Sequence, residues 1–186
     1  AQVLGRNQGP TELDRCDMEN FVLADGLRGN SRLKRMALCD FNRDASNQEV
    51  LAISSALKEN KGLVNLQLWF DFGKSHENWG AICDSLRTHP TLEVLEVRHL
   101  SGSPSLVPSV ITSRVQALVN MLKRNALIHT IGVYLCYSEH KLFRGSVIPH
   151  LESNRFWPRL LAIQKTRPIM YRAKVLVRAC LAGHGD

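Results

Sequence analysis

The sequence predicts an α/β solenoid in which about six helix–turn–strand units stack on one another. A leucine is followed by apolar residues six, nine and eleven positions later, and an Asn stands three positions after most of these leucines. The same positions relative to each leucine are kept, although the spacing between successive leucines varies from 23 residues (Leu4 to Leu27) to 36 residues (Leu86 to Leu122). The alternative is another α/β fold with parallel strands, but that fold does not need the same Asn in the same register.

The leucines that start each unit, and the Asn residues that follow them, are the structural residues of the repeat. They are Leu27, Asn30, Leu57, Asn60, Leu86, Leu122, Asn125, Leu151 and Asn154. His89 replaces Asn in the third full unit. A weaker copy begins at Leu4, where Pro10 and Arg15 occupy positions that should be apolar. We therefore expect an irregular first unit that acts as a cap.

The first half of each unit predicts a helix. In residues 51–62, Ile53 and Leu57 are four positions apart and share one face of a helix, while Lys58 faces outwards. Asn60 is expected to end this helix, because Asn tolerates the left-handed backbone conformation found at helix ends.

The second half of each unit predicts a short strand. In the unit that starts at Leu57, the residues Leu63, Leu66 and Leu68 end in an alternation of two, which is typical of a strand with one buried face. A single unit cannot cover its own apolar face, so neighbouring units must stack.

Three segments, residues 57–68, 86–97 and 122–133, resemble the L-x-x-N-x-x-L-x-x-L-x-L core of leucine-rich-repeat proteins. Their long helical half is similar to the ribonuclease-inhibitor-like type, and the resemblance extends over about residues 4 to 163. It implies a curved solenoid with parallel strands on the concave side and helices on the convex side. It also implies ligand binding, usually of proteins, on the concave face or its rims.

The solenoid is expected over residues 1–163, and a C-terminal capping helix and tail of the same domain over 164–186. Pro168 would start that helix. Residues 70–80 and 99–110 are expected to be long connections, the second because Ser, Gly and Pro interrupt both periods.

The expected partner-binding surface lies on the concave side, just after and between the paired apolar residues of each strand. Trp69, Arg98 and Tyr134 would stand on neighbouring strands, roughly 4.8 Å apart. Gln67 and Glu96 extend this surface. Trp, Arg and Tyr often dominate the binding energy of interfaces. The alternative is that Trp69 and Tyr134 fill space under a folded loop.

A row of basic residues directly follows the anchor leucines. The row consists of Arg28, Lys58, Arg87 and Lys123, in a chain of net charge +7. Complementarity to the helix dipoles explains such a row. The alternative is an edge that binds an anionic partner, either nucleic acid or lipid. No known nucleic-acid-binding module accompanies the charge, so nucleic acid is possible but not favoured.

The sequence predicts a non-enzymatic module with no cofactor and no metal. The five cysteines show no C-x-x-C spacing, which argues against a zinc site and a disulfide framework and favours a cytoplasmic or nuclear location. Cys16 and Cys39 would be neighbours on the concave side, where a metal or redox pair is conceivable. No H-E-x-x-H, phosphate loop or nucleophile elbow occurs. The expected partner is a protein whose identity, like the oligomeric state, the sequence leaves open.

Overall fold

The computed structural model describes residues 7, 9–17, 21–39, 47–69, 76–97, 108–133 and 137–156. The chain divides into two compact units, residues 1–154 and 155–186, and the description below concerns the first. Its strands are β1 (Glu12–Asp17), β2 (Arg35–Cys39), β3 (Asn65–Trp69), β4 (Val94–Val97) and β5 (Thr130–Val133). Its helices are α2 (Phe21–Arg28), α3 (Asn47–Glu59), α4 (His76–Leu86), α5 (Pro108–Leu122) and α6 (Tyr137–Ser146). Further helical residues follow from 148.

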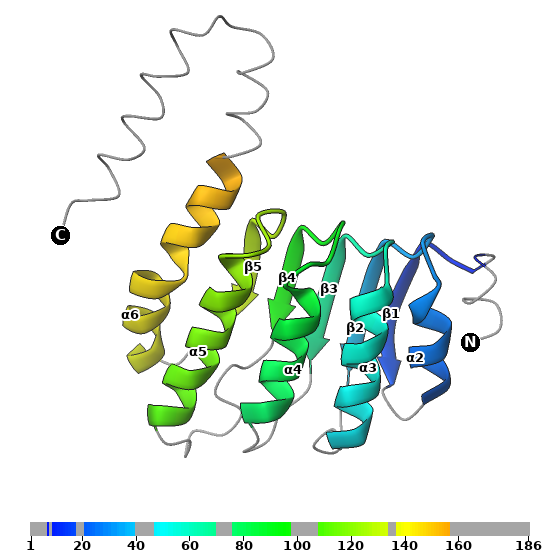
Figure 1. Cartoon of the computed structure of the whole chain (residues 1–186), viewed down its shortest axis with the longest axis horizontal. Helices are drawn as coiled ribbons and strands as arrows, with labels where there is room; N and C mark the ends of the chain where they lie inside the picture. The colour runs from blue at the N-terminus through cyan, green and yellow to red at the C-terminus, as the bar shows by residue number, and fades with distance from the viewer. Residues whose placement is uncertain are drawn as a thin grey trace, which may run out of the picture. The chain divides into compact units, whose positions relative to one another are not determined.

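The five strands form one parallel sheet in which the order across the sheet equals the order along the chain. Helices α2 to α5 lie side by side on one face of this sheet (Figure 1). A doubly wound sheet would instead reverse its strand order and carry helices on both faces. The predicted α/β solenoid of stacked helix–strand units is therefore confirmed.

The core lies between the strands and the helices, and the same strand positions build it in every unit. Leu66 pairs with Leu95, and Leu68 pairs with Val97 in the sheet register. All four side chains are at most 2% exposed. The anchor Leu57 of the preceding helix is completely buried, like Leu27 and Leu86 in the neighbouring units.

Asn60 connects its own unit to the preceding one. Its Nδ2 donates to the carbonyl oxygens of Leu27 and Asn30, each at 2.7 Å. Its Oδ1 accepts hydrogen bonds from the backbone N–H groups of Gly62 and Leu63, each at 2.9 Å. The side chain therefore bonds to four buried backbone groups in the last turn of α2 or beyond the ends of α2 and α3.

The same connection recurs towards the C-terminus of the sheet. Asn125 donates to the carbonyl oxygens of Leu86 and His89, and Asn154 donates to those of Asn125 and Ile128. We call this series the Asn ladder. Among the described non-glycine residues only Asn7 has a positive φ, of 55°. The expectation that Asn ends each helix in a left-handed conformation is therefore wrong, because the amide side chain and not the backbone makes Asn necessary.

His89 stands at the Asn position of its unit but makes only some of the hydrogen bonds that Asn makes in the Asn ladder. Its Nδ1 accepts from the backbone N–H groups of Thr91 and Leu92, at 3.4 and 3.2 Å. The proton of the neutral ring must then be on Nε2, which is buried and has no hydrogen-bond partner. His89 is only 2% exposed, and burial lowers its pKa to about 4.

Two segments that the sequence presents as connections are partly helical. Helix α4 begins at His76, within the connection expected over 70–80, and helix α5 begins at Pro108, within the one expected over 99–110. A proline at the start of a helix costs no hydrogen bond, so Pro108 starts a helix and does not interrupt one. Trp79 is completely buried, which shows that α4 adds its first turn to the core.

The first strand is irregular, as expected, but this changes the place of a cysteine. The register of β1 shifts after Leu13, so Cys16 aligns with Leu38 and not with Cys39. The shift leaves one extra residue in β1, as in a β-bulge. The expected row that joins Cys16 to Cys39 is therefore wrong.

Candidate partner-binding face

The second face of the sheet is the one that no described helix covers, and we call it the open face (Figure 1). Strand β3 alternates between half-buried and buried residues, so Asn65, Gln67 and Trp69 lie on the open face. Glu96 lies beside Gln67 in the sheet register, and Gly132 lies beside Glu96. Side chains on this face differ from strand to strand in size and charge, whereas those on the helix side are uniformly apolar.

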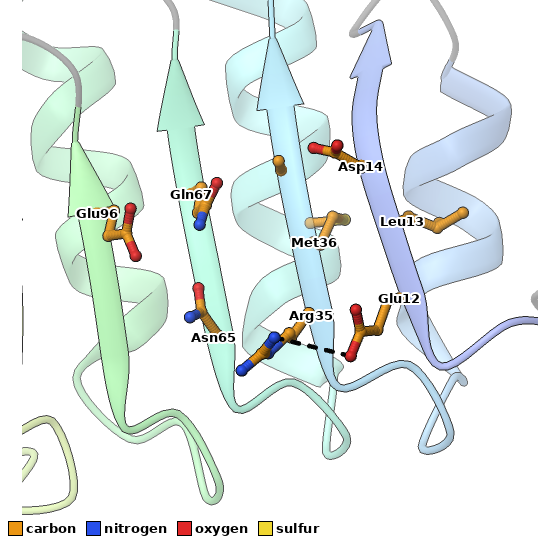
Figure 2. A pocket seen from close by; sticks show the side chains of 9 residues that line it. Glu12, Leu13, Asp14, Arg35, Met36, Asn65, Gln67 and Glu96 are labelled. Atoms are coloured by element: carbon orange, nitrogen blue, oxygen red, sulfur yellow. Dashed lines mark ion pairs between the residues drawn. The ribbon is translucent and has the colours of Figure 1, made fainter.

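A first hollow of about 390 Å³ lies over the N-terminal half of the open face. Figure 2 shows its polar side chains. They are Glu12, Asp14, Arg35, Asn65, Gln67 and Glu96. Ala37, a register partner of Gln67, lines the hollow and leaves it open because its side chain is small.

The charges in this first hollow are predominantly acidic. An ion pair of 3.8 Å joins Arg35 to Glu12, and both side chains are largely exposed (Figure 2). Within the part of the chain that the structure describes, the carboxylates of Asp14 and Glu96 have no ion pair or hydrogen bond. One basic and three acidic side chains thus line the hollow, although the whole chain has a net charge of +7.

A second hollow of about 290 Å³ lies next to the first and shares Glu96 with it. Its other lining residues are Trp69, Val97, Gly132 and Val133. An indole, a carboxylate and a glycine therefore meet at one place on the open face.

The structure brings together three of the five residues expected at the partner-binding surface. Gln67 and Glu96 line the first hollow, and Trp69 and Glu96 line the second. The side chains of Arg98 and Tyr134 lie outside the described residues, so their place beside Trp69 stays a prediction. Trp69 is half-buried, so part of the indole is accessible.

Sequence reasoning missed the residues that complete the first hollow. Glu12, Asp14, Arg35 and Asn65 lie on β1, β2 and β3 near the N-terminal ends of the strands. The signal was available for Asn65, which stands two positions before Gln67 and must share its face. It was available for Asp14 too, which stands two positions after Glu12 and shares its face.

The basic row lies at the C-terminal ends of the helices. Arg28 is the last residue of α2, and Arg87 directly follows α4. Arg28 is 3.9 Å from Asp25 and Arg87 is 2.9 Å from Asp84, so each has an acidic neighbour in its own unit. Lys58 and Lys123 are exposed. The presence of Lys123 also lowers the pKa of His150, after the larger effect of burial.

Within the described ranges no group of three or more His, Cys, Asp or Glu residues could hold a metal ion. Burial raises the pKa of the Cys83 thiol well above its usual range, which makes it a poor nucleophile. In the same part of the chain, no helix is long and apolar enough to cross a membrane.

The chain has the leucine-rich-repeat fold, in the arrangement of the ribonuclease-inhibitor-like type. Parallel strands in chain order, helices on one face and a ladder of buried Asn side chains define this fold. Among solved structures, the chain is similar to one titled leiomodin-1 actin-binding site 2. The match has a TM-score of 0.63 and 17% sequence identity, and it covers 89% of this chain and 95% of that one. No protein-family model and no curated protein matches the sequence.

Proposed function

We propose that this chain is a non-catalytic protein-binding module whose open sheet face contacts the partner. The observation that carries the proposal is the contrast between the two faces of one sheet. Helices α2 to α5 pack on one face, whereas the other presents two hollows lined by Trp69, Glu96 and other varied side chains. A rigid sheet holds these side chains in place before the partner arrives, which lowers the entropy cost of binding.

The favoured contact surface is Gln67, Trp69, Glu96, Arg98 and Tyr134. Three of these residues line the hollows, and the other two follow strands β4 and β5 directly in the sequence. The similarity to the leiomodin-1 domain supports protein binding and makes actin the first partner to test. An intracellular location agrees with the buried free thiol of Cys83.

The test measures partner capture by the wild-type chain and by a Trp69→Ala/Tyr134→Ala double variant. Co-sedimentation with filamentous actin tests the first candidate, and a pull-down with mass spectrometry identifies others. We expect a protein partner that the wild type retains and the double variant loses, while both melt at nearly the same temperature. Equal capture by both would contradict a role of the open face.

Binding of an anionic partner at the basic row is the alternative. One observation favours it: the helix-to-strand connections 29–34, 60–64, 87–93 and 123–129 contain six basic residues and one acidic residue. The basic residues are Arg32, Lys34, Lys61, Arg87, Lys123 and Arg124, and the acidic one is Glu93. Nuclease treatment of the pull-down separates the two functions, because it would abolish capture through nucleic acid only. A Lys58→Gln/Lys123→Gln variant would then bind nucleic acid less strongly, with a smaller dependence on salt concentration.

A further inference from the structure

We propose that the hollow between Trp69 and Glu96 accepts an arginine side chain from the protein partner. This inference rests on the proposed function and names the partner's chemistry at one place on the open face. The three residues that carry it are on three neighbouring strands: Trp69 ends β3, Glu96 is in β4 and Gly132 is in β5. All three line the same hollow.

Gly132 keeps the hollow open. It lies directly beside Glu96 in the register of β4 and β5. A Cβ atom at position 132 would be 3.3 Å from Cγ of Glu96, so even alanine would press against the glutamate side chain. Glycine is unfavourable in a strand interior, and its presence often marks a close approach of another group. Here the space it leaves is bounded by an indole and a carboxylate.

The chemistry of the walls selects a guanidinium group. An indole face attracts a cation, and arginine stacks on it more often than lysine does. A carboxylate accepts the paired N–H donors of a guanidinium. Glu96 is half-buried and has no ion pair or hydrogen bond among the described residues, so its carboxylate is available. Both requirements for arginine recognition are therefore met within one hollow.

Size and charge agree with a single side chain from a basic segment. The volume of about 290 Å³ is just below the range of roughly 300 to 1,000 Å³ of pockets that enclose small-molecule ligands. The adjoining first hollow has the second unpaired carboxylate, that of Asp14, while the positive charge of Arg35 is balanced by Glu12. A partner segment with an arginine and further basic residues would be complementary to both hollows.

The experiment titrates the folded chain with a defined peptide and follows the indole N–H signal of Trp69 by NMR. The probe is the capped peptide Gly-Gly-Arg-Gly-Gly, and its control contains citrulline, which has nearly the same shape but no charge. We expect the arginine peptide to shift the Trp69 signal with a dissociation constant on the order of 1 mM, as for a single weak anchor. The citrulline peptide should leave the signal unchanged.

Variants of the chain locate the site. Glu96→Gln should weaken binding by at least about three-fold, the effect of losing one exposed charge pair. Gly132→Val should block the hollow, and the spectrum itself reports whether the variant is folded. Glu59→Gln is the matched control, because it removes the same charge from the exposed end of α3, outside both hollows, and should change binding less than about two-fold.

Three results would overturn the inference. The first is equal binding of the arginine and citrulline peptides. The second is unchanged binding in both Glu96→Gln and Gly132→Val. The third is binding that appears only in an Arg98→Gln variant, since the chain's own arginine would then occupy the hollow. None of these results contradicts the proposed function. If Trp69 and Tyr134 remain necessary for capture of a protein, the open face binds the partner without an arginine in this hollow.

Discussion

The two faces of the sheet are built under different constraints. On the helix side, Leu66, Leu68, Leu95 and Val97 are at most 2% exposed and repeat nearly the same side chain in each unit. On the open side, the corresponding row reads Ala37, Gln67, Glu96 and Gly132. Stacking requires the first set to be uniform, because each unit buries its neighbour, whereas it leaves the second set free. Variation on a regular scaffold is therefore where binding specificity can lie.

The largest effect is expected from the helix side. Leu66→Ala removes a completely buried side chain and leaves a cavity in the core, so the free energy of unfolding should fall by about 2 to 5 kcal/mol. Chemical denaturation measures it. The control is Leu51→Ala on α3, because Leu51 is 54% exposed, and should change stability by less than about 0.5 kcal/mol. Similar losses for the two variants would contradict the assignment of the core.

The Asn ladder should be almost as sensitive. Asn60→Ala removes the donor to the carbonyl oxygens of Leu27 and Asn30 and the acceptor for two buried backbone N–H groups, those of Gly62 and Leu63. We expect a loss of about 3 kcal/mol in the free energy of unfolding. Asn120→Ala is the matched control, since Asn120 is exposed on α5 and its side chain accepts a hydrogen bond from Gln116 of the same helix. A loss below about 1 kcal/mol in Asn60→Ala would show that the ladder contributes little.

His89 should make the chain sensitive to acid. Its pKa of about 4 in the folded chain lies below the usual value of 6.5, so the unfolded chain binds the proton first as the pH falls. The stability that His89 contributes is thus complete above about pH 6.5 and falls by roughly 2 to 3 kcal/mol towards pH 4.

His89→Asn should remove this loss, because Asn does not titrate. It should also raise stability at pH 7 by about 1 kcal/mol, since the amide can donate to the preceding unit as Asn60 does. Denaturation of both chains from pH 7.5 to pH 4 measures the difference and cancels the contribution of the other histidines. Parallel pH curves for the two chains would contradict the account of His89.

The smallest effect on stability is expected on the open face. Trp69→Ala lowers the free energy of unfolding by about 1 kcal/mol or less, because Trp69 is only half-buried. It should weaken partner binding much more, because a central indole contact is worth about 2 kcal/mol. The dissociation constant should then rise about thirty-fold. A titration with the captured partner and a denaturation curve separate the two. A large loss of stability would favour the alternative in which Trp69 fills space under a loop.

Much of the architecture could be predicted, because stacking imposes the same side chains at the same positions in each unit. The spacing of Leu57, Leu66 and Leu68 alone indicates the helix, the strand and the buried face. The details that could not be predicted are departures from the repeat. The bulge in β1 depends on the pairing with β2, and the lost donor of His89 depends on the reach of an imidazole compared with an amide.

The candidate site could be predicted only in part. The two-residue period of a strand placed Gln67, Trp69 and Glu96 on one face, but the depth of each hollow depends on small neighbours. The sequence gives no reason to place Ala37 and Gly132 at a binding site, since neither side chain has a functional group. Their importance follows from the register, which places them beside larger polar side chains.

Photo-crosslinking to the partner tests most directly whether the open face is the binding face. A photoreactive amino acid is placed at Gln67 on the open face or at Leu51 on the exposed side of α3, and the cross-linked partner is identified by mass spectrometry. The account predicts cross-links from position 67 and none from position 51. Cross-links from position 51 alone would contradict it, because the partner would then bind the helices and the open face would have no role.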